Sequence, residues 1–414
     1  MKTNNKKYLT PRLRFPEFEK DGNFQEKPLG YFCNYWNGSG NESEVTEDGQ
    51  YYLISLNSID IEGNLKNDMK RVAITDNSLK KGDLVMVLSD VAHGNFLGLT
   101  AIIPDNNYVL NQRMAGLRIK DFKKIDPRYL RLFINFHQKY FKRQGQGSSQ
   151  QNLSKASVIN FPVLVPSIQE QQKIADFLSN LDEWLATEEE KLTLLQQHKK
   201  GLLQNLFPAQ GETVPKLRFP EFKNSGEWEV KRLGEVGEFF GGGTPSTNKV
   251  EYWEGDINWF TPTEIKNRYV TESIRKITKL GLDNSSAKLL PVGSILITSR
   301  ATIGDCAIAL AECSTNQGIQ SLVVNKNYNN IFIYYWIYSN KNLFIKKSSG
   351  STFSEINKSA IKSIKITIPT LPEQQKIAAC LSALDEQIEA QEQKIELLQQ
   401  HKKGLLQNLF PTVS

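Results

Sequence analysis

The sequence predicts an α+β fold in which two globular domains are each followed by a long α-helix. The two helices are expected to pack as an antiparallel coiled coil with pseudo-twofold symmetry. Three observations lead to this prediction. The segment Leu195–Pro208 recurs letter for letter as Leu398–Pro411, both copies continue a heptad pattern of apolar residues, and short β-rich runs precede each copy. The chain of 414 residues is therefore two copies of one unit, and we expect its function to be carried out twice along one molecule.

The repeat divides the chain into six predicted segments. They are an N-terminal segment (1–22), a first globular domain (23–165), a central helix (166–208), a linker that repeats the N-terminal segment (209–227), a second globular domain (228–368) and a C-terminal helix (369–414). Leu13–Phe18 and Leu217–Phe222 both read Leu-Arg-Phe-Pro-Glu-Phe. Repeats longer than about 50 residues lie outside the range of solenoids and propellers. We therefore interpret the repeat as duplication of a whole domain with its connector; the alternative is two enzyme domains joined by a linker.

Each helix is predicted from its first turn and from its end. Ser167-Ile-Gln-Glu170 and Thr370-Leu-Pro-Glu373 match the capping box, in which two side chains satisfy free backbone N–H groups at a helix start. Both helices are expected to end before a proline, Pro208 or Pro411, because proline cannot continue a helix.

A heptad seam runs along both predicted helices, with apolar residues alternately three and four positions apart. Its central members are Leu178, Leu181, Leu185, Leu192 and Leu195 in the first helix and Leu381, Leu384, Ile388, Ile395 and Leu398 in the second. Polar residues interrupt the seam at matching positions, Glu188 and Gln391, then Lys199 and Lys402. Such residues set register and partner choice at some cost in stability. A seam this long and narrow favours pairing of the two helices over packing of each helix only on its own domain.

The regions between the repeated segments have diverged, and short strands are predicted in them, for example after Gly82 and after Gly293. Each domain closes with an aromatic, helix-like stretch that we expect in the core, followed by a basic loop rich in small polar residues. Such loops supply phosphate contacts in DNA-binding proteins. The candidate DNA-binding residues are Lys142, Arg143, Ser148 and Ser149 in the first domain and Lys346, Lys347, Ser351 and Thr352 in the second. The alternative for each loop is a solvated surface turn.

Composition and missing motifs exclude several classes of protein. No apolar run reaches the ~20 residues that cross a bilayer, and the basic N-terminus lacks the apolar core of a secretory signal. Four cysteines without CxxC spacing argue against structural zinc and for reduced thiols in a cytoplasm. The net charge of +6 is compatible with nucleic acid but is weak evidence alone. No P-loop, H-E-x-x-H or G-x-S-x-G motif is present, so we predict no catalytic residues, no metal site and no catalysis by this chain alone.

Two diverged domains joined to near-identical coiled-coil helices resemble the specificity subunit of type I restriction-modification systems. The resemblance covers the whole chain. Its most specific residues are the two Glu-Gln-Gln-Lys-Ile-Ala starts (Glu170–Ala175 and Glu373–Ala378) and, in the second domain, Gly242-Gly-Thr-Pro-Ser246, Ser299-Arg300 and Asn316-Gln317-Gly318. The first domain departs from this pattern, since it has Ser89-Asp90 where the second has Ser299-Arg300. Base contacts therefore cannot be carried over from the second domain to the first.

The resemblance implies a division of labour among several subunits. Each diverged domain would be a target recognition domain that reads one half of a split target in double-stranded DNA, and the helices would set the gap between the half-sites. Two modification subunits would dock on the helices and methylate adenine N6 with S-adenosylmethionine. Two restriction subunits would add ATP-driven translocation and cleavage, which requires Mg. The cofactors would all be bound by these partners and none by this chain.

Two questions stay open from the sequence. Arg300 is a candidate for a base contact, because arginine can bind guanine through two hydrogen bonds, but it could equally be a salt-bridged structural residue. A non-catalytic coiled-coil adaptor without DNA specificity would also explain the duplicated helices and the missing catalytic motifs. It would not explain two separately diverged domains that each carry a basic polar loop.

Overall fold

The computed structural model describes residues 10–74, 78–91, 94–147, 150–349 and 354–412. The chain forms two compact units that cut across its linear order. Unit 1 combines Met1–Glu189 with Lys394–Ser414, and unit 2 is the continuous stretch Glu190–Gln393. Each globular domain therefore shares its unit with parts of both long helices.

The domain of unit 1 is built on a four-stranded antiparallel sheet and a three-stranded sheet. The first has the order β2 (Cys33–Asn37), β9 (Met114–Ile119), β5 (Leu84–Val87) and β7 (Thr100–Ile102), and the second β4 (Arg71–Val72), β3 (Tyr51–Ile54) and β8 (Tyr108–Leu110). Two further pairs are β1 (Gln25–Pro28) with β11 (Pro162–Val165) and β6 (Ser89–Val91) with β10 (Gln150–Asn152). The short helices are α1 (Leu29–Phe32), α2 (Pro127–Phe136), α3 (Gln138–Gln144) and α4 (Lys155–Ile159).

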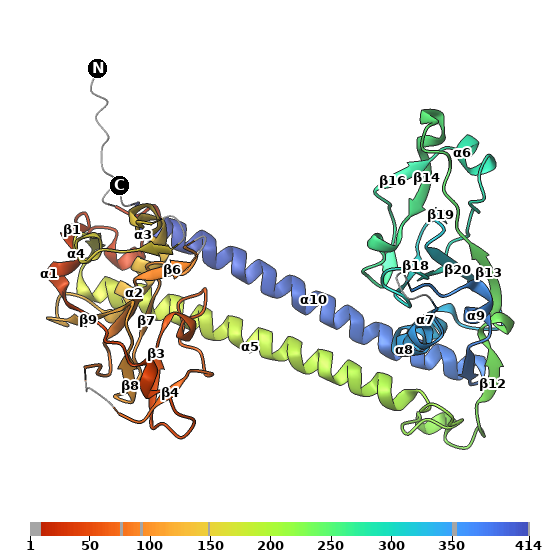
Figure 1. Ribbon diagram of the computed structural model, residues 1–414, viewed down its shortest axis with the longest axis horizontal. Coiled ribbons are helices and arrows are strands. Elements are labelled where there is room, and N and C mark those ends of the chain that lie inside the picture. The colour runs from red at the N-terminus through yellow and green to blue at the C-terminus, as the bar shows by residue number, and fades with distance from the viewer. Residues whose placement is uncertain (1–9, 75–77, 92–93, 148–149, 350–353, 413–414) are drawn as a thin grey trace. The chain divides into compact units, whose positions relative to one another are not determined.

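Unit 2 repeats this arrangement with other residues. Its larger sheet has the order β13 (Gly237–Gly241), β20 (Ile319–Val324), β17 (Ile295–Thr298), β18 (Cys306–Ala309) and β15 (Tyr269–Val270). Its smaller sheet has the order β16 (Arg275–Ile277), β14 (Trp253–Phe260) and β19 (Cys313–Thr315), and β12 (Glu229–Arg232) pairs with β21 (Lys365–Ile368). The short helices are α6 (Lys279–Asp283), α7 (Asn330–Ser339), α8 (Lys341–Lys346) and α9 (Lys358–Lys362). In Figure 1, α6 and the smaller sheet lie at the end of unit 2 remote from α10.

The aromatic stretches predicted to lie in the core include α2 and α7, whose side chains are mostly buried, although Tyr338 near the end of α7 is exposed. In unit 1 the Asp126 carboxylate caps α2 by accepting from the backbone N–H groups of Arg128 and Tyr129, and proline occupies the first turn. Tyr129 and Phe133 on α2 are fully buried. These rings fill the space between the larger sheet and the long helices.

The long helices are α5 (Ile168–Leu206) and α10 (Leu371–Leu409), each of 39 residues and therefore about 58 Å long (Figure 1). Within unit 1, Glu188 pairs with Lys394 at 2.6 Å and Asp182 pairs with Lys402, so the numbering falls along one helix as it rises along the other. The predicted antiparallel pairing is thus seen inside unit 1. Unit 2 repeats it with ion pairing of Lys199 to Asp385.

The seam lies between the helices in both units. Leu178 and Leu381 are fully buried, and a further group is less than a tenth exposed: Leu181, Leu185, Leu384, Ile388 and Ile395. Leu192, Leu195 and Leu398 are half-buried. The polar interruptions Glu188 and Gln391 are also buried, and the two seam lysines, Lys199 and Lys402, pair with aspartates of the opposite helix. Glu188, Lys199 and Lys402 therefore each lie within reach of a side chain of opposite charge on the other helix.

The end of each helix completes the core beside the start of the other. In unit 1, Leu409 and Phe410 join the core that contains Ile174 and Leu178, and the Phe410 ring lies 5.6 Å from that of Tyr129. In unit 2, Leu206 and Phe207 take the same place beside Ile377 and Leu381.

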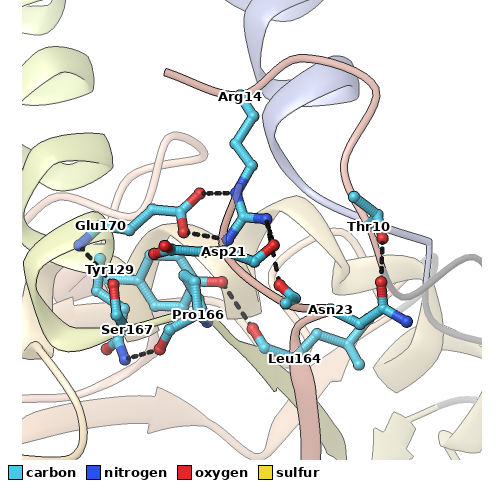
Figure 2. Close-up of polar contacts among 11 residues, drawn as sticks. Thr10, Arg14, Asp21, Asn23, Tyr129, Leu164, Pro166, Ser167 and Glu170 are labelled. Atoms are coloured by element: carbon cyan, nitrogen blue, oxygen red, sulfur yellow. Dashed lines mark hydrogen bonds and ion pairs between the residues drawn. The ribbon is translucent and has the colours of Figure 1, made fainter. Parts of the chain in front are cut away.

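An arginine from each repeated opening segment holds the start of the long helix, as Figure 2 shows for unit 1. The Arg14 guanidinium donates to both carboxylate oxygens of Glu170, at 2.8 and 2.7 Å, and Arg218 does the same to Glu373. The predicted capping boxes are therefore incomplete. Ser167 Oγ does accept from the Glu170 N–H, but the glutamate carboxylates are taken by arginines from outside the helix.

No helix among the described residues is long and apolar enough to cross a membrane.

Candidate nucleic-acid interface

Loops from distant parts of the second domain meet at one end of β13, β20 and β17, three neighbouring strands of its larger sheet. The Gly243 N–H donates to the Thr315 carbonyl and the Ser299 N–H to the Gly318 carbonyl, both at 2.8 Å. Thr244 Oγ1 donates to Gln317 Oε1 at 2.5 Å. We call this the polar edge of unit 2; it comprises Gly242–Thr244, Ser299–Arg300, Asn316–Gly318 and Glu355. The polar edge contains Ser299-Arg300, Asn316-Gln317-Gly318 and the first three residues of Gly242-Gly-Thr-Pro-Ser246, the motifs that carry the family resemblance in this domain.

The first domain has a corresponding polar edge, which comprises Gly38–Gly40, Leu88–Asp90, Asn111–Arg113 and Gln150–Asn152. The Leu88 N–H donates to the Arg113 carbonyl at 3.0 Å, and Asp90 pairs with Gln151 between β6 and β10. A shared feature is a very close backbone approach. A Cβ atom on Gly38 would lie 2.0 Å from the Asn111 carbonyl oxygen, and one on Gly242 would lie 1.9 Å from that of Asn316. Only glycine fits either position.

Gly38 was missed by sequence reasoning, although a signal for it existed. The first domain has no Gly-Gly-Thr-Pro, yet Gly38 follows Leu29-Gly30 at the same spacing as Gly242 follows Leu233-Gly234. Aligning the two domains on the shared Leu-Gly pair therefore places Gly38 opposite Gly242.

The Arg300 side chain is half-exposed and forms an ion pair. Its Nε lies 2.9 Å from Glu355 Oε1, and the side chain is 49% exposed. The salt bridge that the sequence analysis gave as the alternative to a base contact is thus present. It nevertheless leaves much of the side chain accessible. The matching place in the first domain is held by Ser89, not by Asp90 as the sequence alignment predicted, because Ser89 pairs with Asn152 as Arg300 pairs with Glu355. The next residue, Asp90, is buried, and its carboxylate accepts from the Phe96 N–H at 2.8 Å and so stabilises a turn.

Arg113 is a further cation of this candidate interface, and no motif in the sequence singles it out. It is exposed on the polar edge of unit 1, in the place that Gly318 occupies in unit 2. Its φ is 67°, in the left-handed region, which costs a residue with a side chain about 1–2 kcal/mol.

The predicted basic loops lie next to these edges. Lys142, half-buried, and Arg143, exposed, end α3, and the following Gln146 N–H donates to the Asn152 carbonyl at 3.0 Å. Lys346 and Lys347 are exposed at the end of α8, and Lys347 Nζ donates to Ser363 Oγ at 3.3 Å. The Ser349 N–H then donates to the Glu355 carbonyl at 2.9 Å. The other four candidates, Ser148, Ser149, Ser351 and Thr352, lie outside the described residues.

Within the described part of the chain, no three His, Cys, Asp or Glu side chains are grouped so that they could hold a metal ion. The cysteines are poor nucleophiles, because a reactive cysteine must be a thiolate. Burial raises the pKa of Cys33 to about 12 and that of Cys313 to about 12, and it raises the pKa of Cys306 as well.

The fold and the two polar edges define a class of protein that presents one backbone frame twice with different side chains. Comparison with known proteins identifies the family. The model of the type I restriction modification DNA specificity domain matches residues 23–197 and 225–400. The chain belongs to this family.

Several curated relatives and solved structures are similar to the chain. The MjaIX specificity subunit of Methanocaldococcus jannaschii is 38% identical over 190 residues, and the EcoR124I/EcoR124II specificity subunit of Escherichia coli is 35% identical over 167. These matches span 44% and 41% of the relatives' lengths, and 44% and 39% of this chain. The crystal structure of the type I restriction-modification S subunit from M. genitalium shares the fold, with a TM-score of 0.62 at 16% identity over 98% of this chain and 100% of the other.

Proposed function

We propose that this chain is the DNA-recognition subunit of a type I restriction-modification complex. Each globular domain binds one half of a bipartite target in double-stranded DNA. The observation that carries the proposal is the pair of polar edges, which share a glycine-dependent frame but differ in the side chains they present, as at Arg113 and Gly318. Hydrogen-bonding side chains at base edges are what read a DNA sequence. A duplicated frame with different side chains suits two different half-sites.

The candidate phosphate contacts are the basic loop residues beside each edge. Lys142 and Arg143 in unit 1, and Lys346 and Lys347 in unit 2, provide the sequence-independent part of the affinity. Phosphate contacts position a protein on the duplex, and base contacts supply the specificity. Ser148, Ser149, Ser351 and Thr352 remain candidates for the same role.

The long helices dock the partner subunits and set the spacing between half-sites. Two modification subunits, which are adenine-N6 methyltransferases, bind along them, and two restriction subunits join that assembly. The repeated sequence supports two equivalent partners, because exposed side chains such as Lys200 and Lys403 are the same in both copies. S-adenosylmethionine, ATP and Mg are bound by these partners, and the complex works in the cytoplasm.

Methylome sequencing tests this function directly. A host that expresses the chain with its modification partner is expected to carry methylated adenines in one split motif. Replacing residues 228–368 with the second domain of another family member should change only one half of that motif. A change in both halves, or in neither, would contradict the modular assignment.

Binding to DNA separates the proposal from a plain adaptor. In a gel shift with the modification partner present, the complex is expected to prefer DNA that contains the motif over scrambled DNA. An adaptor without DNA specificity would show no such preference.

A further inference from the structure

Each domain presents one arginine on its polar edge, but from a different place in the shared frame. Arg113 lies in the Asn-Gln-x segment of the first domain, where the second has Gly318. Arg300 lies two residues after the end of β17 in the second domain, where the first has Ser89 two residues after the end of β5. The arginine therefore occupies a different position on each of the two polar edges.

The backbone at Arg113 is unfavourable for any side chain. Its φ of 67° suits glycine, and the first domain nevertheless has a long cationic side chain there. Strained residues of this kind cluster at binding sites, where the surrounding structure holds them in place. Among the described residues, no hydrogen bond or ion pair involves the Arg113 guanidinium, so its donors are available to a ligand.

Arg300 also lies beside a residue with a left-handed backbone conformation. The next residue, Ala301, has a φ of 59°, again in the left-handed region. Glu355 holds the Arg300 guanidinium through its Nε, which orients the group and leaves its two terminal nitrogens without a partner among the described residues. Those two nitrogens are the fork that matches the O6 and N7 acceptors of guanine.

We propose that Arg113 in the first domain and Arg300 in the second each read a guanine in the major groove, and that their different positions help make the two half-sites different. The proposal rests on the assignment of this chain as a DNA-recognition subunit. Each guanine lies at a different offset within its half-site, because the two arginines leave the frame from different loops.

The decisive variant is Arg113→Gly. It removes the cation and also relieves the backbone strain, so the melting temperature of the complex is expected to stay the same or rise. Affinity for DNA with the full motif, measured by fluorescence anisotropy with the modification partner bound, should fall about 10-fold to 100-fold. The methylated motif should become degenerate at one position of one half-site, while the other half-site is unchanged.

Ala301→Gly is the matched control, because it relieves the same strain in the second domain and keeps Arg300. We expect it to leave affinity and motif unchanged. Arg300→Gln should relax one position of the opposite half-site from the one that Arg113→Gly affects.

Two outcomes would overturn the proposal. An Arg113→Gly complex with unchanged affinity and motif would show that the side chain contacts no base. An equal loss of affinity on motif and scrambled DNA would assign Arg113 to a phosphate. If the unaltered complex itself lacked sequence preference, the proposed function would fail, and that result is visible before any variant is made.

Discussion

Replacing Arg14 with methionine should destabilise unit 1 far more than its place near the chain start suggests. The Arg14 side chain is 7% exposed and the Glu170 side chain 1%, and two hydrogen bonds join them. Arg14 Nη1 also donates to the Asp21 carbonyl at 2.7 Å. The hydrogen bond to Glu170 is the largest of the effects that raise the pKa of Arg14. Arg14→Met would leave a carboxylate buried without its partner.

The size of the effect follows from that burial. Breaking a buried ion pair by removing one partner costs about 3–5 kcal/mol. For a unit of roughly 200 residues, each kcal/mol lowers the melting temperature by about 2–4 °C. We therefore expect the unit 1 transition in differential scanning calorimetry to fall by about 10 °C. Arg218→Met should do the same to unit 2, where Arg218 and Glu373 are 8% and 1% exposed.

Two further variants make the test specific. Arg12→Met removes an exposed arginine from the same segment and should shift the transition by less than about 2 °C, as most exposed substitutions do. Arg14→Met combined with Glu170→Gln should recover part of the stability, because no charge is then left buried. If the single variant melted like the unaltered protein, or the double variant like the single one, the account of a buried pair would be refuted.

Three other outcomes are expected. Lys346→Ala with Lys347→Ala should weaken binding to all DNA sequences and reduce the salt dependence of the affinity by a slope of roughly 1 for each phosphate that is no longer bound; an unchanged slope would mean a merely solvated loop. Inserting four residues between Ala186 and Glu190 adds about 6 Å of helix. Methylome mapping should then show that both half-sites are retained and that the gap between them has changed by one or two base pairs. An active variant with the original gap would mean that the helices only bind the partner subunits and do not set the spacing. Burial lowers the pKa of His137, so the unfolded ring takes up a proton first, and unit 1 should lose stability as the pH falls through about 6.5; His137→Phe should abolish that part of the pH dependence of the melting temperature.

The long helices could be predicted because their pattern is local and repeated. Leu178 and Leu381 occupy equivalent seam positions, and heptad spacing places them against a partner helix without knowledge of the rest of the fold. The strands after Gly82 and Gly293 were predicted for a similar reason, since a short apolar run after a glycine turn is a local signal.

The hydrogen bonds from Arg14 to Glu170 and from Arg218 to Glu373, at the starts of the long helices, could not be predicted in the same way. Glu170 matches a capping box, and that local pattern directs its side chain back toward Ser167. Arg14 competes for that carboxylate from a distant part of the sequence, and a charged donor makes a stronger bond than a neutral backbone N–H. The recurrence of both residues as Arg218 and Glu373 was the available clue.

At the polar edges, the sequences of the two domains have diverged so far that structurally equivalent residues are hard to recognise. Gly242 stood out through its glycine-rich neighbours, whereas Gly38 has serine beside it and was recognised only by its contact with the Asn111 carbonyl. Arg113 could not be found from the sequence, because its significance depends on a backbone angle that no motif encodes.

The make-up of unit 1 has a consequence for how the protein is synthesised. Unit 2 is continuous from Glu190 to Gln393, whereas unit 1 needs Lys394–Ser414 as well as everything before Glu190. Leu409 and Phe410, which complete the core around Tyr129 and Phe133, follow the whole of unit 2 in the sequence. The first domain can therefore be completed only after the second has been translated, and until then the growing chain exposes an apolar surface to which chaperones can bind.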